Sequence, residues 1–292
     1  MDQATTLREM AQPFGAERHL SESRRPRVIA ITSGKGGVGK TNVVANLAIA
    51  LSDLRSRVTI LDADFGLANI DVLLGLTPKY HLGHVLFGEK ELSDIIIEGP
   101  HGVRIIPASS GIQELSELTP AQRRDLVSKL SALDYDTDFL LIDTAAGISN
   151  NVMHFLTASD EVIVITTPEP TAIVDAYAMI KVIHGETPDK VIKLIVNSTQ
   201  TAKDASQVME QINLVARQFL NREVQYLGAI DKDAAVAKAV MRQSPVLDVY
   251  PDAPASRCLR MLARRIKNSS PADPESDMTM TAFWKTLFIG DN

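Results

Sequence analysis

Short apolar runs alternate along the chain with longer stretches of helical periodicity. The clearest runs cover residues 28–32, 57–62, 103–107, 139–143, 161–167 and 191–197. Short runs that are apolar throughout are typical of parallel strands buried on both faces of a sheet. The pattern therefore predicts a single doubly wound α/β domain, with a mostly parallel sheet of seven or eight strands and helices on both faces.

The alternation covers residues 26–268 and stops on either side of them. Residues 1–25 precede the first strand and contain one short helical pattern, with Ala4, Leu7 and Met10 along one side. Residues 269–277 are dominated by Ser, Pro, Ala, Asp and Glu, which indicates a linker. We therefore expect a leader, one domain, a linker and a C-terminal segment of residues 278–292.

The pattern of apolar residues in the C-terminal segment predicts an amphipathic helix. Its apolar side chains follow the spacing of one helical face: Met280, Phe283, Trp284, Leu287 and Phe288. Two interpretations are open, because such a helix either folds back onto the domain or lies in a membrane interface. We favour membrane targeting, and the two also fit together if the helix is packed in the monomer and released on dimerisation.

Composition and charge narrow the class of protein. The 292 residues are 45% hydrophobic, which is ample for a packed core. We expect a cytoplasmic protein, because no stretch reaches the roughly 18 apolar residues of a membrane span and the N-terminus lacks a signal-peptide pattern. Cys258 is the single cysteine, which excludes an intrachain disulfide and a site built from paired cysteines. The net charge of −6 predicts no direct binding of nucleic acid.

A glycine-rich segment between the first strand and the first helix carries the main chemical signal. Residues 33–42 read Ser-Gly-Lys-Gly-Gly-Val-Gly-Lys-Thr-Asn, a phosphate-binding loop in its expected context. Its glycines let backbone N–H groups approach a polyphosphate, Lys40 reaches the terminal phosphates, and the Thr41 hydroxyl is placed to bind Mg²⁺. The predicted nucleotide-binding residues here are Gly34, Lys35, Gly36, Gly37, Val38, Gly39, Lys40, Thr41 and Asn42.

Two further strands end in carboxylates. The run 57–62 delivers Asp62 and Asp64, and the run 139–143 ends at Asp143 in the Walker B pattern. Open parallel sheets bind ligands at the carboxyl ends of their strands. We therefore expect Asp143 beside the Mg²⁺ held by Thr41. Two aspartates two residues apart can serve the metal region and the attacking water separately.

Together these motifs resemble the MinD/ParA class of P-loop ATPases. Lys35, directly after the first glycine, gives the deviant Walker A form of that class. The resemblance implies ATP hydrolysis with Mg²⁺ and an ATP-dependent homodimer in which Lys35 reaches the partner's nucleotide. It also implies that Asp64 orients the attacking water, while Asp62 supports the metal region. The expected catalytic residues are Lys35, Lys40 and Asp64, and the expected metal residues are Thr41, Asp62 and Asp143.

The same class often recognises adenine at positions that match Asn197 and Asp233. The chain departs from the usual pattern at both places. Ser198 stands where an arginine usually follows, and Asp231 replaces the proline of a Pro-x-Asp motif. The two assignments rest on position in the chain.

Other segments are similar to the FlhG (FleN, YlxH) branch, which regulates flagellar number and placement. They are a leader motif like DQAxxLR at residues 2–8, the sequence Asp-Thr-Ala-Ala-Gly-Ile at 143–148, and residues 166–171. The resemblance implies that the leader docks on an FlhF-type GTPase and stimulates it, through Asp2, Gln3, Ala4, Leu7 and Arg8. It further implies flagellar switch proteins or a flagellar transcriptional activator as partners, and reversible peripheral attachment to the inner face of the cell membrane. Without this resemblance, residues 1–25 are simply a disordered leader.

Several rival functions share the nucleotide motifs. A cell-division MinD has proline where this chain has Ala145, and it lacks the leader motif. A chromosome or plasmid partition ParA is disfavoured by the amphipathic C-terminus and by the lack of strongly basic character. Iron–sulfur carrier ATPases need paired cysteines. A binding module that never hydrolyses ATP is disfavoured by Asp64.

Overall fold

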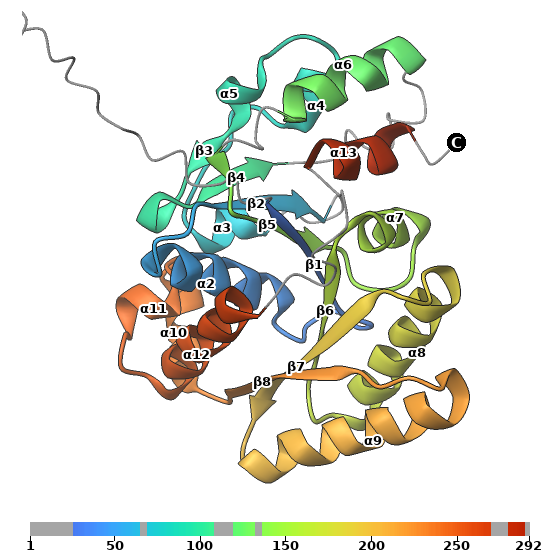
Figure 1. Cartoon of the computed structure of the whole chain (residues 1–292). Coiled ribbons are helices and arrows are strands. Elements are labelled where there is room, and N and C mark those ends of the chain that lie inside the picture. The colour runs from blue at the N-terminus through green and yellow to red at the C-terminus, as the bar shows by residue number, and fades with distance from the viewer. Residues whose placement is uncertain (1–25, 65–68, 108–118, 132–135, 270–279, 290–292) are drawn as a thin grey trace, which may run out of the picture.

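An eight-stranded sheet forms the centre of the protein (Figure 1). The computed structural model describes residues 26–64, 69–107, 119–131, 136–269 and 280–289. The strands lie in the order β3-β4-β2-β5-β1-β6-β7-β8, and all neighbours are parallel except β3 and β4. The strands are β1 (Arg27–Thr32), β2 (Val58–Ala63), β3 (Ile97–Glu98), β4 (Arg104–Pro107), β5 (Phe139–Thr144), β6 (Glu161–Thr166), β7 (Val191–Thr199) and β8 (Gln225–Asp231).

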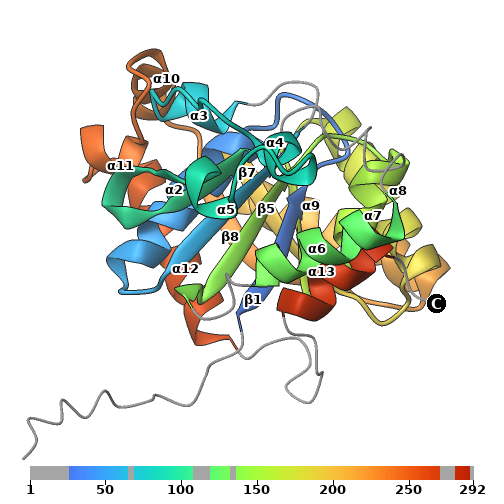
Figure 2. The same cartoon turned by 90° about the horizontal axis from the view of Figure 1, so that it is seen from above.

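Helices cover both faces of this sheet (Figure 2). One face packs against α4 (Leu82–Leu86), α5 (Leu92–Ile95), α6 (Pro120–Ser131), α7 (Asn150–Ala158), α8 (Pro170–Glu186), α9 (Ala202–Leu220) and α13 (Met280–Ile289). The other packs against α2 (Lys40–Asp53), α3 (Ile70–Leu73), α10 (Ala234–Met241), α11 (Val246–Val249) and α12 (Pro254–Asn268). Side chains alternate between the two faces, so Val28 lies in the first core and Ile29 in the second. The predicted doubly wound fold is confirmed.

Each apolar run identified in the sequence forms a strand. β7 continues beyond the predicted end at Asn197 to Thr199. The runs omit β3, which has only two residues, and β8, whose apolar pattern is interrupted by Gly228. The leader and residues 270–277 of the predicted linker lie outside the described residues.

The C-terminal helix is packed against the domain, in the fold-back position that the sequence left open beside membrane targeting. α13 lies against α6 and α7. Phe283 and Trp284 are fully buried, Phe288 is nearly so, and Leu287 packs at the edge of the same core. The apolar face finds a partner surface within the chain, so the fold-back interpretation describes this conformation. Among the described helices, none is long and apolar enough to cross a membrane.

A buried ion cluster links the amino ends of three strands to the end of α12. The Glu161 carboxylate, only 1% exposed, accepts hydrogen bonds from Arg27 and Lys193. The Arg27 guanidinium also donates to the carbonyl oxygens of Ile266 (2.6 Å) and Ser269 (3.0 Å). Removing one member of such a cluster leaves buried charge without compensation. The loss of stability on breaking the cluster is therefore larger than the net stability that the intact cluster contributes.

We expect Glu161→Gln to lower the free energy of unfolding by about 3–5 kcal/mol, because two buried cations lose their counter-charge. Urea unfolding followed by circular dichroism measures this. The matched control is Glu223→Gln, since Glu223 pairs with Arg217 at 2.7 Å on the surface and should contribute at most about 1 kcal/mol. Equal small losses in both variants would contradict the account.

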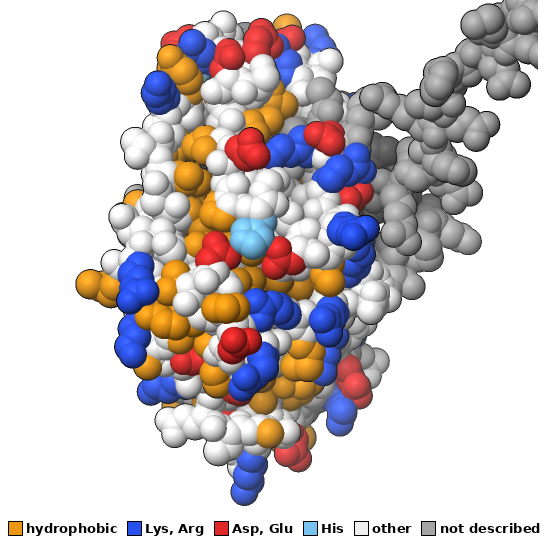
Figure 3. All heavy atoms as spheres, turned by 90° about the vertical axis from the view of Figure 1, so that its left-hand side faces the viewer, with side chains coloured by type: hydrophobic (Ala, Val, Ile, Leu, Met, Phe, Trp, Pro, Cys, Tyr) orange, Lys and Arg blue, Asp and Glu red, His pale blue; other side chains and the backbone are white. Residues whose placement is uncertain are grey.

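A histidine joins three segments on the second face. His101 lies 2.6 Å (Nδ1) from the Asp53 carboxylate of α2 and 2.8 Å (Nε2) from the Asp248 carboxylate of α11. Partial burial opposes protonation, but the two carboxylates outweigh it and raise the pKa of His101 above its ordinary value of 6.5. Figure 3 views the side on which α11 lies, where acidic, basic and hydrophobic side chains are interspersed.

This arrangement predicts a pH-dependent contribution to stability. A raised folded-state pKa means that the contribution is complete below the unfolded value near 6.5 and is lost as the pH rises through the folded value. The difference in urea midpoint between wild type and His101→Gln should therefore be largest near about pH 5.5 and shrink towards about pH 8.5. Asp248→Asn should weaken the dependence. A difference that stays constant with pH would contradict the account.

Candidate functional site

The predicted site residues meet at the carboxyl edge of the sheet. β1 ends at Thr32 and leads into the glycine-rich loop, and its neighbour β5 ends at Thr144. β2 lies on the other side of β5, in a register that pairs Asp62 with Asp143. Because these strands are parallel neighbours, the loop and both acidic segments lie side by side.

Steric and conformational constraints explain three of the four glycines of the loop. Gly37 and Gly39 have φ angles of 82° and 87°, a region that side chains with a Cβ rarely adopt. A Cβ on Gly34 would lie 2.2 Å from the backbone carbonyl oxygen of Asp175 in α8. The loop then enters α2 at Lys40, and the first turn of α2 holds no acidic residue. The open N–H groups and positive dipole end of α2 are thus free to meet an anion.

A buried ion pair occupies the middle of this edge. Lys40 Nζ lies 2.5 Å from Asp143 Oδ1, and both side chains are buried. Burial raises the pKa of Asp143 despite the opposing effect of Lys40 and the nearby Thr41 side chain. The second carboxylate oxygen, Asp143 Oδ2, is buried without a hydrogen-bond partner among the described residues. Such an oxygen needs a further partner.

The chemistry of this edge fits Mg²⁺. The Thr41 hydroxyl and the unpartnered Asp143 oxygen are hard oxygen ligands, the type that Mg²⁺ prefers. Within the described ranges, no three His, Cys, Asp or Glu side chains form a metal site by themselves. Mg²⁺ is commonly held by one or two protein oxygens together with substrate phosphates, so the donor set suits a metal that arrives with a nucleotide.

Asp62 and Asp64 lie on the β2 side of the ion pair. Burial, followed by the negative charge of Asp143, raises the pKa of Asp62 to about 7. Its two oxygens accept from the backbone N–H groups of Asp64 (3.3 Å) and Ile70 (3.4 Å), and so connect both ends of the segment that contains residues 65–68. Asp64 is half-buried and close enough for its charge to raise the pKa of Asp143.

Lys35 contacts its own chain. Its Nζ lies 3.1 Å from Glu169 Oε2 and 3.1 Å from Thr171 Oγ1, after the end of β6. The Lys35 side chain is 40% exposed and that of Glu169 is 67% exposed. Sequence reasoning noted residues 166–171 only as a branch signature. It missed the contact with Lys35, which joins segments 134 residues apart in the chain.

Asn197 and Asp233, the two residues expected to contact adenine, both line one cavity of about 270 Å³ next to the start of α2. Asn197 donates from Nδ2 to the Val38 carbonyl oxygen at 2.7 Å. Asp233 accepts from the backbone N–H groups of Ala235 (2.8 Å) and Ala255 (3.2 Å). These backbone contacts hold both side chains in place. The cavity also shares Gly39 and Asn42 with the phosphate loop.

Comparison with known proteins agrees with this geometry. The ParA family model, described as "NUBPL iron-transfer P-loop NTPase", matches residues 25–267. The chain belongs to the ParA family of P-loop NTPases. It is 42% identical over 253 residues to the antiactivator FleN of Pseudomonas aeruginosa, covering 86% of this chain and 90% of FleN. It is 35% identical to the flagellum site-determining protein YlxH of Helicobacter pylori, covering 90% of this chain and 89% of YlxH.

Solved structures of this family share the fold. One is the MinC:MinD cell division complex of Aquifex aeolicus, with a TM-score of 0.68, 26% identity, and coverage of 84% of this chain and 97% of that chain. Another is MinD of Pyrococcus horikoshii with Mg-ADP, with a TM-score of 0.68, 25% identity, and coverage of 83% and 96%. As a ParA-family member and a homologue of FleN and YlxH, this protein is an ATPase.

For this ParA-family ATPase we expect two single substitutions to separate binding from turnover. Lys40→Ala removes a charged phosphate contact and should weaken binding of a fluorescent ATP analogue by about 100-fold or more. Asp64→Ala should keep ATP bound, lose hydrolysis and accumulate a dimer in light scattering. Lys238→Ala, at an exposed lysine of α10, is the control and should behave as wild type. Normal hydrolysis by Asp64→Ala would place the catalytic function elsewhere.

Proposed function

We propose that this ATPase is a regulator of flagellar number or placement that works as an ATP-dependent switch. The observation that supports the proposal most directly is its similarity to FleN and YlxH over most of each chain. The nucleotide site is complete in residue types, from the loop to the acids of β2 and β5. The single cysteine, Cys258, leaves the chain without the paired thiolates that bridge an iron–sulfur cluster.

The proposed reaction is hydrolysis of ATP to ADP and phosphate. Lys40 would turn from Asp143 to the terminal phosphates, and Thr41 and Asp143 would hold the metal, with Asp62 bracing the adjoining segment. Mg²⁺ would neutralise charge on the phosphate oxygens. Asp64 orients the attacking water from the β2 side. Asn197 and Asp233 border the place of the adenine.

Lys35 is the residue through which we propose that the dimer acts. Its contacts with Glu169 and Thr171 are exposed, and exposed ion pairs contribute little to stability. The lysine can therefore leave them at small cost. In an ATP dimer it supplies positive charge to the partner's nucleotide as the phosphoryl group departs.

The proposal that α13 binds a membrane rests on an unsatisfied polar group in its packed position. The Trp284 indole N–H is buried without a hydrogen-bond partner among the described residues, which costs about 1–3 kcal/mol. At a membrane interface an indole meets both an apolar layer and hydrogen-bond acceptors. We infer that α13 exchanges between its site on α6 and α7 and a membrane surface. Two copies on an ATP dimer bind more tightly than one.

Flotation with anionic vesicles tests this exchange. Wild type should float with ATP and less with ADP, because the dimer presents two helices to one surface and avidity rises by roughly 100-fold. Phe283→Glu should abolish flotation while leaving the ATP dimer intact. Lys285→Gln, at an exposed position of α13, is the control and should float. Equal flotation in ATP and ADP would contradict gating, and none in either state would leave the fold-back position as the only one.

The leader is the segment proposed to act on an FlhF-type GTPase, through the residues of the motif at 2–8. A segment of this size buries too little apolar area to fold alone, and would order on its partner.

A synthetic peptide of residues 1–25 should raise the GTP hydrolysis rate of such a GTPase without the ATPase domain. The control peptide carries Leu7→Glu and Arg8→Glu. Equal stimulation by both peptides, or stimulation by neither, would refute the assignment.

A further inference from the structure

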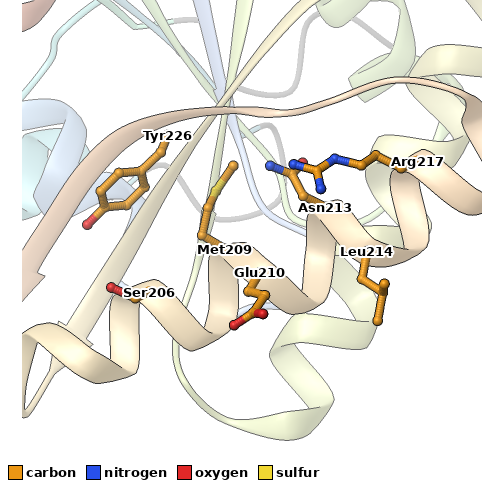
Figure 4. Close-up of a pocket in the computed structure, with 7 residues that line it drawn as sticks. All are labelled: Ser206, Met209, Glu210, Asn213, Leu214, Arg217 and Tyr226. Atoms are coloured by element: carbon orange, nitrogen blue, oxygen red, sulfur yellow. The ribbon is translucent and has the colours of Figure 1, made fainter.

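We propose that residues 4–10 of the leader dock into a groove between α9 and β8 of their own chain. The groove has a volume of about 440 Å³ and is lined by Ser206, Met209, Glu210, Leu214, Arg217 and Tyr226. Figure 4 shows Met209 projecting from α9 towards the strand that carries Tyr226. Glu210 and Leu214 extend from the side of α9 that lies farther from this strand.

The groove is already formed in the structure. Its α9 residues follow helical spacing and make one continuous stripe along the helix. Asn213, which also lines it, joins α9 to the start of β8 through two hydrogen bonds with the Val224 backbone, at 2.8 and 3.2 Å. No backbone movement of these segments is needed to receive a ligand.

The groove exposes apolar side chains at the end of the sheet. Leu214 is 65% exposed and Tyr226 is 45% exposed. β8 is the last strand in the sheet order, so its outer side pairs with no other strand among the described residues. Edges of this kind are commonly covered by a helix or loop, and an apolar ligand would shield these side chains from water.

The leader can reach this place. Gln225 of β8 is level with Ile31 of β1 through the pairings across β6 and β7. From Arg27 to Gln225 the path crosses three strand spacings of the sheet and runs four residues along β1. Together these give a distance of about 20 Å. Residues 11–25 are long enough to bridge this distance, since a chain of that length reaches about 20 Å on average as a random coil and up to about 50 Å when extended. A tether of this length gives the leader a high effective concentration at the groove.

The chemistry of the leader matches the groove. The spacing of residues 4–10 places Ala4, Leu7 and Met10 on one side of a helix, should one form, and we assign that side to Leu214 and Tyr226. Arg8 follows Leu7 and brings one positive charge to the rim.

The groove offers a negative charge to Arg8. Arg217 pairs with Glu223 at 2.7 Å, whereas Glu210 has no ion pair among the described residues. We therefore assign Glu210 as the partner of Arg8.

Docking has a consequence that rests on the proposed function. Leu7 and Arg8 are also the residues proposed to contact the GTPase. While they lie in the groove they are withheld from that partner, so the ATPase domain restrains its own activating segment.

Intrachain cross-linking tests the docking directly. In a Cys258→Ser background, Thr6→Cys with Ser206→Cys should cross-link with a short bis-maleimide in the full-length protein. Thr6→Cys with Gln211→Cys, an exposed position of α9 that does not line the groove, is the control. Leu214→Glu should cause loss of the Ser206 cross-link, while Phe219→Glu, equally exposed on α9, should leave it unchanged. Arg8→Glu should weaken the cross-link and Glu210→Arg should restore it.

Each outcome decides one point. Equal yields at Ser206 and Gln211, or a yield that Leu214→Glu leaves intact, overturn the proposal. Cross-links that form only between differently tagged chains also overturn it, and make a second copy the occupant. A leader peptide that fails to stimulate a GTPase, while the cross-link forms, refutes the partner function and leaves the docking standing.

Discussion

The buried contact between Lys40 and Asp143 is the interaction on which this structure depends. A lysine and an aspartate are brought out of water at the carboxyl edge of two neighbouring strands, 2.5 Å apart. Each charge makes the burial of the other tolerable. The same two groups are those that a phosphate and a metal ion need, so the site is held in shape by the groups that serve it.

Surface exposure separates the fixed parts of the protein from the exchangeable ones. The Glu161 cluster and the Lys40 ion pair are buried, so removing one member leaves buried charge without compensation. Lys35 is held by exposed partners, and exposed ion pairs cost little to exchange. α13 is held differently: its apolar face is buried, and the Trp284 indole N–H has no hydrogen-bond partner among the described residues. The Lys35 contacts are those proposed to exchange on dimerisation, release of α13 to a membrane must offset the loss of its buried contacts, and the Lys40 ion pair sets the geometry of the nucleotide site.

The sequence was sufficient for the fold and for the residues of the phosphate loop, because both depend on local patterns. Continuous apolar runs predicted the parallel strands, and parallel strands place Asp62 and Asp143 together without further information. Contacts between distant segments could not be predicted in the same way. The meeting of Lys35 with Glu169 and the bridging of Asp64 and Ile70 by Asp62 depend on loop paths. The position of α13 could not be chosen from its sequence, because amphipathicity shows that an apolar face needs cover and does not show whether the domain or a membrane provides it.

The central claim is that hydrolysis requires a dimer in which Lys35 acts across the interface. Mixing Lys35→Ala with Asp64→Ala tests it most directly, because a mixed dimer has one site with Asp64 intact and a Lys35 supplied by the other chain. Neither variant should hydrolyse ATP alone, and an equal mixture should recover up to about a quarter of the wild-type rate, since about half of random dimers are mixed and each has one complete site. A mixture that shows only the average of the two separate rates, at a concentration where light scattering detects dimers, would contradict the account.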